Sequence, residues 1–139
     1  MNPETIALVR QSWSAILPMR RDVCGDFYQR LFATYPELRP LFTGDMERQA
    51  MLFVTMINTV VSALDDPGPV QPLIETLGAR HAHYGVSAQD YAKFETVLLD
   101  TLHQALGDAF SAETRIAWAR VYERLVEIMR AGAGDDAVR

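Results

Sequence analysis

The sequence has few of the residues that would indicate a secreted, disulfide-stabilised or nucleic-acid-binding protein. It holds one cysteine, Cys24, which can form no intrachain disulfide and fits a reducing compartment. Lysine and arginine number 13 against 18 acidic residues, so the formal net charge is -5. No basic cluster is present that could contact phosphates or anionic lipid, and we expect no nucleic-acid or membrane partner.

Signals for export or for membrane insertion are also missing. Residues 1–4 include none of the basic and apolar segments of a signal peptide. The uncharged stretch 50–64 is shorter than the roughly 20 apolar residues that a membrane-spanning helix needs. We therefore expect a cytoplasmic protein.

The length and the composition are those of one globular domain. The chain has 139 residues, of which 49% are hydrophobic and 22% are charged, close to the averages of soluble proteins. A chain of this length can fold without a disulfide or a structural metal. We expect a single domain over residues 1–139, in which about 131–139 form a frayed polar tail.

Apolar residues recur three and four positions apart along most of the chain, which is the spacing of amphipathic helices. No segment alternates polar and apolar residues for long enough to predict a strand. The predicted fold class is all-α, with about six long helices and one or two short ones. The clearest stripes comprise Ile6, Val9, Trp13 and Ile16; Val23, Phe27, Leu31 and Tyr35; Gln49, Phe53, Met56, Ile57, Val60 and Leu64; Val70, Leu73, Ile74, Leu77, His81 and Tyr84; and Tyr91, Phe94, Leu98, Leu102 and Ala105.

Capping residues and helix breakers mark where these helices begin and end. Asparagine, aspartate and serine side chains can accept from the free N–H groups of a first turn, whereas proline and glycine terminate helices. The segment 36–42, bracketed by two prolines, predicts one tight helical turn. The predicted starts are Asn2, Asp45, Ser87 and Ser111, and the predicted ends are marked by Pro18, Pro36, Gly85 and Gly107.

The histidines are incompatible with a multi-histidine zinc site. His81 and His83 form an H-x-H pair, which on a helix points in directions roughly 200° apart. Only His81 falls on the apolar stripe of its helix, and His103 lies off the stripe of its own. His81 is then either a hydrogen-bonded core histidine or the single axial ligand of a cofactor such as haem, which brings its other ligands itself.

Two further polar residues border apolar helix faces. Gln49 heads an apolar stripe, and a buried amide without a partner costs about 1–3 kcal/mol, so it either hydrogen-bonds to something or lies near solvent. Tyr28 offers a hydroxyl, although core tyrosines with one hydrogen bond are common. Motifs of other chemistries are missing, including a glycine-rich phosphate loop, C-x-x-C, H-E-x-x-H and the nucleophile elbow.

Taken together, fragments spread over nearly the whole chain resemble globins, in particular single-domain bacterial globins and neuroglobin. Their shared order along five helices makes the resemblance specific, although each fragment alone is modest. The similar fragments are residues 8–13, 27–32, 36–42, 77–86 and 105–122.

The resemblance implies a three-over-three helical sandwich around haem b, with His81 as the proximal iron ligand. Phe42 would be the phenylalanine that contacts haem, Tyr28 the distal tyrosine, Gln49 the distal polar residue and Phe53 the side chain over the iron. The short helix that many animal globins have between the positions of Phe42 and Gln49 is expected to be absent. The other predicted haem-pocket residues are Leu77, whose carbonyl would accept from the second ring nitrogen of His81, Tyr84, Val86 and Tyr91.

Three departures from relatives refine this expectation. Neuroglobin has a distal histidine that binds iron, whereas Gln49 is a poor ligand, so an open sixth position is expected here. Flavohaemoglobins carry a reductase domain and a glutamate in the last helix that polarises the proximal histidine, and residues 131–133 include no carboxylate. Phe53 also stands where a smaller aliphatic side chain is frequent.

The resemblance implies reversible binding of dioxygen, with release slowed by hydrogen bonds from Tyr28 and Gln49. Nitric oxide and carbon monoxide are further expected ligands. One alternative is a nitric oxide dioxygenase that depends on an external reductase. Another is a haem-based gas sensor or a haem-free interaction module that kept the fold.

Overall fold

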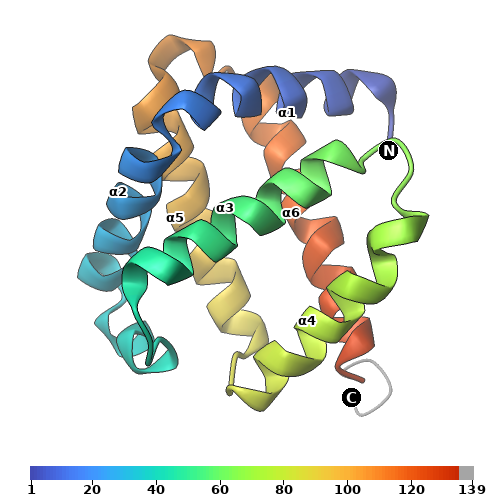
Figure 1. Ribbon diagram of the computed structural model, residues 1–139. Helices are drawn as coiled ribbons and strands as arrows, with labels where there is room; N and C mark the ends of the chain where they lie inside the picture. Colours follow the sequence, from blue (N-terminus) through green and yellow to red (C-terminus); the bar gives the residue numbers. More distant parts are fainter. Residues whose placement is uncertain (135–139) are drawn as a thin grey trace.

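Six α-helices make up most of the part of the protein that the structure describes (Figure 1). The computed structural model describes residues 1–134, and within them there is no strand, which confirms the predicted all-α class. No helix of this described part is long and apolar enough to cross a bilayer. The helices are α1 (Pro3–Ile16), α2 (Arg20–Thr34), α3 (Met46–Ser62), α4 (Gln71–His83), α5 (Ala88–Leu106) and α6 (Ala112–Gly132), with short 3₁₀ segments η1 (Leu17–Met19), η2 (Pro36–Leu41), η3 (Gly68–Val70) and η4 (Gly107–Ala109).

Helices α1, α3, α5 and α6 begin at the capping residues that the sequence predicts. The Asn2 side chain accepts from the N–H of Thr5 at 2.8 Å at the start of α1. At the start of α5 the capping box is complete, because the Asp90 N–H donates to the Ser87 hydroxyl at 3.2 Å and the Ser87 N–H donates to the Asp90 carboxylate at 2.9 Å. Gly85, just after α4, has a φ of 91°, a conformation that glycine adopts without the steric penalty of a side chain.

The structure differs from the prediction at two kinds of position. Residues 1–134 hold four short 3₁₀ segments rather than one or two, because the chain also tightens into single turns at 68–70 and 107–109. Helix α6 continues to Gly132, past the predicted start of the tail at 131, since its end packs against α4. Residues 135–139 of the predicted tail lie outside the described part. Residues 43–45 form no helix, as expected.

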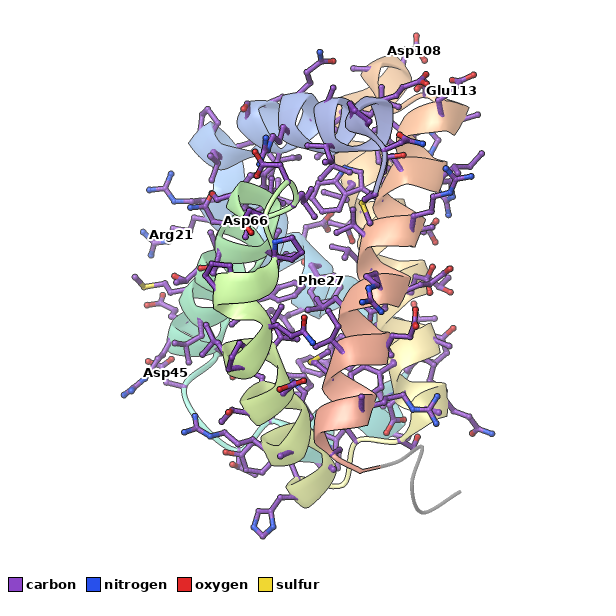
Figure 2. All side chains as sticks on the ribbon, turned by 90° about the vertical axis from the view of Figure 1, so that its right-hand side faces the viewer. Arg21, Phe27, Asp45, Asp66, Asp108 and Glu113 are labelled. Atoms are coloured by element: carbon purple, nitrogen blue, oxygen red, sulfur yellow. The ribbon has the colours of Figure 1, made fainter. Side chains whose placement is uncertain are left out.

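The helices are arranged in two crossing layers. In Figure 1, α3 and α4 pass in front of α5 and α6, while α1 closes one end and α2 stands beside α5. Figure 2 shows Phe27 in the interior and charged residues such as Arg21 and Asp45 at the outside. The Trp118 indole on α6 donates to the Ser12 hydroxyl on α1 at 2.7 Å, and the Trp13 indole stacks edge-on against it, so two tryptophans fix α1 on the core.

Helix α4, which carries His81, packs chiefly on α6. Two glycines make this approach possible. A methyl group at Gly78 would collide with the main chain of Met129, and one at Gly132 would collide with the main chain of Glu75. The inner face of α4 is therefore set by a backbone-to-backbone contact with α6 rather than by contact with α3.

Candidate functional site

His81 lies in the last turn of α4, with its orientation fixed by a hydrogen bond. Its Nδ1 is 2.7 Å from the carbonyl oxygen of Leu77, one helical turn earlier, which confirms the predicted contact. A carbonyl oxygen can only accept, so Nδ1 carries a proton, and in the neutral ring the lone pair is then on Nε2. A neutral imidazole held in this tautomer is the form in which histidine binds a metal.

Tyr91, at the start of α5, supports the His81 ring. The two rings are stacked with centroids 6.2 Å apart and planes 28° apart, and Tyr91 is buried. The backbone oxygen of His81 also accepts from the N–H of Val86 at 3.0 Å, which closes the turn after α4. The hydroxyl of Tyr122 on α6 donates to the Tyr91 backbone oxygen at 2.8 Å. Three elements therefore determine where the imidazole lies.

Tyr28 on α2 and Gln49 on α3 are brought together by the fold, close enough for the Gln49 side chain to affect the pKa of the Tyr28 phenol. Burial raises the pKa of Tyr28 to about 12, and this outweighs the opposing effect of the Gln49 side chain. The phenol therefore stays protonated at neutral pH and keeps an O–H to donate. The sequence predicts that Gln49 either has a polar partner or lies near solvent. In the structure it is half-buried and lies next to the Tyr28 hydroxyl.

An aromatic cluster surrounds the Tyr28 hydroxyl-bearing ring. The centroid of the Phe42 ring is 5.5 Å from that of Tyr28, in an edge-on arrangement. The centroid of the Phe53 ring is 6.1 Å from that of Tyr28, and the two rings are tilted. Phe94 on α5 was not among the predicted site residues, yet its ring lies 5.9 Å from that of Phe42. Its place on the apolar stripe three residues after Tyr91 was the available signal.

The structure does not gather all the predicted residues into one group. Tyr84 is 63% exposed, and its ring lies against that of His83, which is also exposed. His103 is exposed and stacks on Phe110, as expected for a histidine off the apolar stripe. Tyr84 therefore lies apart from the half-buried Leu77 and His81.

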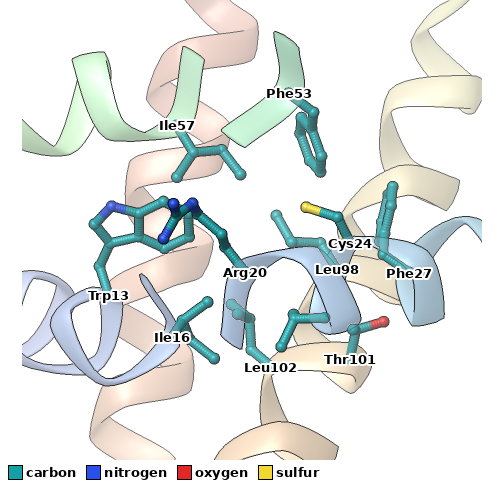
Figure 3. Close-up of a pocket in the computed structure, with 11 residues that line it drawn as sticks. Trp13, Ile16, Arg20, Cys24, Phe27, Phe53, Ile57, Leu98, Thr101 and Leu102 are labelled. Atoms are coloured by element: carbon teal, nitrogen blue, oxygen red, sulfur yellow. The ribbon is translucent and has the colours of Figure 1, made fainter. Parts of the chain in front are cut away.

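A small apolar cavity lies on the α1 side of Phe53. It has a volume of about 20 Å³ and is lined by residues of the α1 end, α2, α3 and α5. Figure 3 shows the Cys24 sulfur directed into it, close to Phe27 and Phe53. Burial raises the pKa of the Cys24 thiol to about 11, which keeps it protonated and a poor nucleophile.

The donor set and the burial pattern fit a haem. No three His, Cys, Asp or Glu side chains within residues 1–134 converge to hold a metal ion, so the lone donor His81 suits a cofactor that brings its remaining ligands. α3 and α4 make little contact with each other, and the apolar side chains around the site stay only partly buried. A flat apolar group would cover them. These half-buried side chains are Phe42, Phe53, Leu77, Val86 and Phe94.

Comparison with known sequences identifies relatives along most of the chain. The profile of the globin family matches residues 25–129. The flavohemoprotein of Bordetella parapertussis is 28% identical over 132 residues, which cover 93% of this chain and 33% of the relative. That of Bacillus subtilis is 24% identical over 125 residues, covering 88% and 31%. The chain thus spans about a third of the length of the curated relatives it matches.

Comparison with solved structures agrees with this. An engineered carbene transferase, described as a candidate nitric oxide dioxygenase from Rhodothermus marinus, is 25% identical with a TM-score of 0.87, covering 99% of this chain and 96% of that one. A bacterial globin from Campylobacter jejuni is 17% identical and shares the fold with a TM-score of 0.84, covering 99% of this chain and 100% of that one. The family profile covers well over half of the sequence, and the chain belongs to the globin family.

Proposed function

We propose that this globin holds haem b through His81 and reversibly binds dioxygen, and other diatomic ligands such as nitric oxide and carbon monoxide, at a five-coordinate iron. Family membership implies haem binding. The observation that carries the proposal is the 2.7 Å hydrogen bond between His81 Nδ1 and the Leu77 carbonyl, because it leaves Nε2 as the ligating nitrogen. Phe42, Phe53, Val86 and Tyr91 would line the haem.

Bound haem would supply an iron that takes up a diatomic gas. The chain's own contribution to holding that gas would come from Tyr28 and Gln49. Both can donate a hydrogen bond to partial negative charge on a ligand, and such bonds to charged groups are worth about 1.5–3 kcal/mol. Since 1.4 kcal/mol is a factor of ten, one such bond slows ligand escape about tenfold or more. We therefore infer tight, slowly released dioxygen.

Gln49 also bears on the coordination number. An amide is a poor iron ligand, so Gln49 would leave the iron free on its side of the haem. The sixth position is therefore open in this proposal. The absorption spectrum of the purified protein in its ferric, ferrous and carbonyl states tests this. An intense Soret band with a five-coordinate ferrous spectrum is expected, whereas colourless protein or a six-coordinate ferrous spectrum with no added gas would refute the proposal.

A second candidate is a nitric oxide dioxygenase that receives electrons from an external reductase. Its support is the 25% identity to the candidate nitric oxide dioxygenase of Rhodothermus marinus and the similarity to flavohemoproteins. The end of α6 argues against efficient turnover, because it lacks the glutamate that polarises the proximal histidine in flavohaemoglobins. No carboxylate occurs at 131–133, and Gly132 lies so close to the Glu75 main chain that no side chain fits there.

A nitric oxide consumption assay with an added reductase separates the two candidates. Slow dioxygen release predicts a single burst of consumption, stoichiometric with the protein, for a binding protein. Sustained multiple turnovers would instead support the dioxygenase. A variant lacking the Tyr28 hydroxyl serves as a control for whether the burst depends on retained dioxygen.

A further inference from the structure

Two carboxyl groups meet in a groove between α5 and α6. Glu95 on α5 and Glu123 on α6 both line this groove, close enough for the charge of Glu123 to raise the pKa of Glu95. The groove has a volume of about 230 Å³. The titratable and charged groups that line it are Tyr91 and Glu95 from α5 and Tyr122, Glu123, Glu127 and Arg130 from α6.

This pair adjoins the hydrogen bond that holds Tyr91. Tyr122 precedes Glu123 on α6, and its hydroxyl donates to the Tyr91 backbone oxygen at 2.8 Å. Tyr91 lies one helical turn before Glu95, on the same face of α5. The Tyr91 ring in turn stacks on His81. A continuous set of contacts thus runs from the carboxyl pair through Tyr122 and Tyr91 to the proximal imidazole.

The protonation state of the pair changes near neutral pH. Burial, followed by interaction with the Glu123 side chain and its charge, raises the pKa of Glu95 to about 7. Burial and the charge of Glu95 also raise the pKa of Tyr122 well above its usual range, so that hydroxyl remains a donor whenever Glu95 titrates. Below the transition at least one of the two carboxyls is protonated. Above it, both are charged and repel each other.

We propose that Tyr122 is a positioning residue for His81, acting through Tyr91, and that the Glu95–Glu123 pair makes this positioning sensitive to pH. The proposal rests on haem being held by His81. When the last proton of the pair leaves for solvent, repulsion between the carboxylates separates the facing turns of α5 and α6 at Tyr122. The hydrogen bond to the Tyr91 carbonyl then weakens, and the ring that stacks on His81 gains freedom to shift.

The test uses the haem-loaded protein and follows the iron–histidine stretching frequency by resonance Raman spectroscopy, together with the dioxygen release rate. Between about pH 5 and 9, the stretching frequency and the release rate of wild type should each show one transition near pH 7. The release rate should change about twofold to fivefold, at or below the lower end of typical coupling between sites. Glu95→Gln should hold the low-pH values at every pH, and Tyr122→Phe should abolish the transition while haem stays bound.

Glu127→Gln is the matched control, because Glu127 lines the same groove but takes no part in the carboxyl pair. It should retain the wild-type transition. A flat wild-type profile, or a normal transition in Glu95→Gln or Tyr122→Phe, would overturn the proposal. Carbon-13 NMR titration of the Glu95 carboxyl gives a readout that needs no haem. A midpoint near 7 that falls towards the ordinary value in Glu123→Gln supports the coupling of the two carboxyls, and an ordinary midpoint in wild type contradicts it.

These outcomes separate the inference from the proposed function. If His81→Gly still binds haem as wild type does, the proposed function fails and the Raman experiment loses its basis. If His81→Gly loses haem but the wild-type profile is flat, haem binding at His81 stands and only the coupling through Tyr122 is refuted.

Discussion

Gln49 on α3 lies close enough to Tyr28 on α2 to affect the pKa of its phenol, beside the ring of Phe42. Two polar groups that meet among aromatic rings, with one of them held protonated by burial, form a pair of hydrogen-bond donors directed by separate helices. This relationship gives the distal side of the proposed site its chemistry. It also provides the first test of the account.

Replacing Tyr28 with phenylalanine should raise the dioxygen dissociation rate at least several-fold, because the variant keeps the ring and loses one donor worth about 1.5–3 kcal/mol to a charged acceptor. Stopped-flow displacement of dioxygen by carbon monoxide measures the rate. Tyr35→Phe is a matched control, since Tyr35 is half-buried and its ring interacts with Lys93 instead. An unchanged rate in Tyr28→Phe would remove this hydroxyl from the mechanism.

Cys24 should react slowly with thiol reagents in the folded protein. Its sulfur is buried and burial raises its pKa to about 11, so little thiolate exists at pH 8. Labelling with a coloured disulfide reagent at pH 8 should be at least about tenfold slower in buffer than in denaturant, where the pKa returns towards its model-peptide value. Equal rates under both conditions would show that the thiol is accessible.

Two glycine-to-alanine variants test the contact that sets α4 on α6. Gly132→Ala places a methyl group against the Glu75 main chain and should lower the free energy of unfolding by about 1–3 kcal/mol. Gly25→Ala, on an exposed part of α2 with open space around it, should raise that free energy by about 0.5–1 kcal/mol. Urea denaturation measures both. Similar effects of the two variants would show that the close approach of the helices is unimportant.

The carboxyl pair also has a consequence for stability. The pKa of Glu95 is about 7 in the folded protein against an ordinary value of 4.5, so between these pH values the folded state binds more protons than the unfolded state. The free energy of unfolding contributed by this site therefore falls as pH rises from about 4.5 to 7 and is constant above. Urea denaturation across this range should show a shallower fall in Glu95→Gln. If the free energy of unfolding of wild type and of Glu95→Gln fell in parallel with rising pH, this prediction would be contradicted.

Much of the fold could be predicted from the sequence because the signals are local. Asn2, Asp45 and Ser111 cap helices where their side chains predict a first turn, and Gly85 and Gly107 end helices with positive φ. The apolar stripe also distinguished His81 from His83. The tautomer of His81 followed in turn from the helical spacing to Leu77.

What could not be predicted depends on contacts between helices. The backbone approach at Gly78 depends on where α6 lies, and the meeting of Glu95 with Glu123 depends on the register of α5 against α6. Neither contact produces a periodic pattern within a single segment of the sequence, so neither could be predicted from it. Tyr84 shows the reverse error, because the stripe places it on the apolar face, but α4 ends at His83 and the chain carries the ring outward.

The central claim is that His81 Nε2 binds the iron of haem, and a His81→Gly variant tests it most directly. Expressed with added haem, this variant should lose the Soret band of wild type and regain a five-coordinate ferrous spectrum when free imidazole is supplied. His83→Gly, two residues away and exposed, should match wild type throughout. A His81→Gly protein that takes up haem and binds carbon monoxide as wild type does, with no imidazole added, would contradict the account.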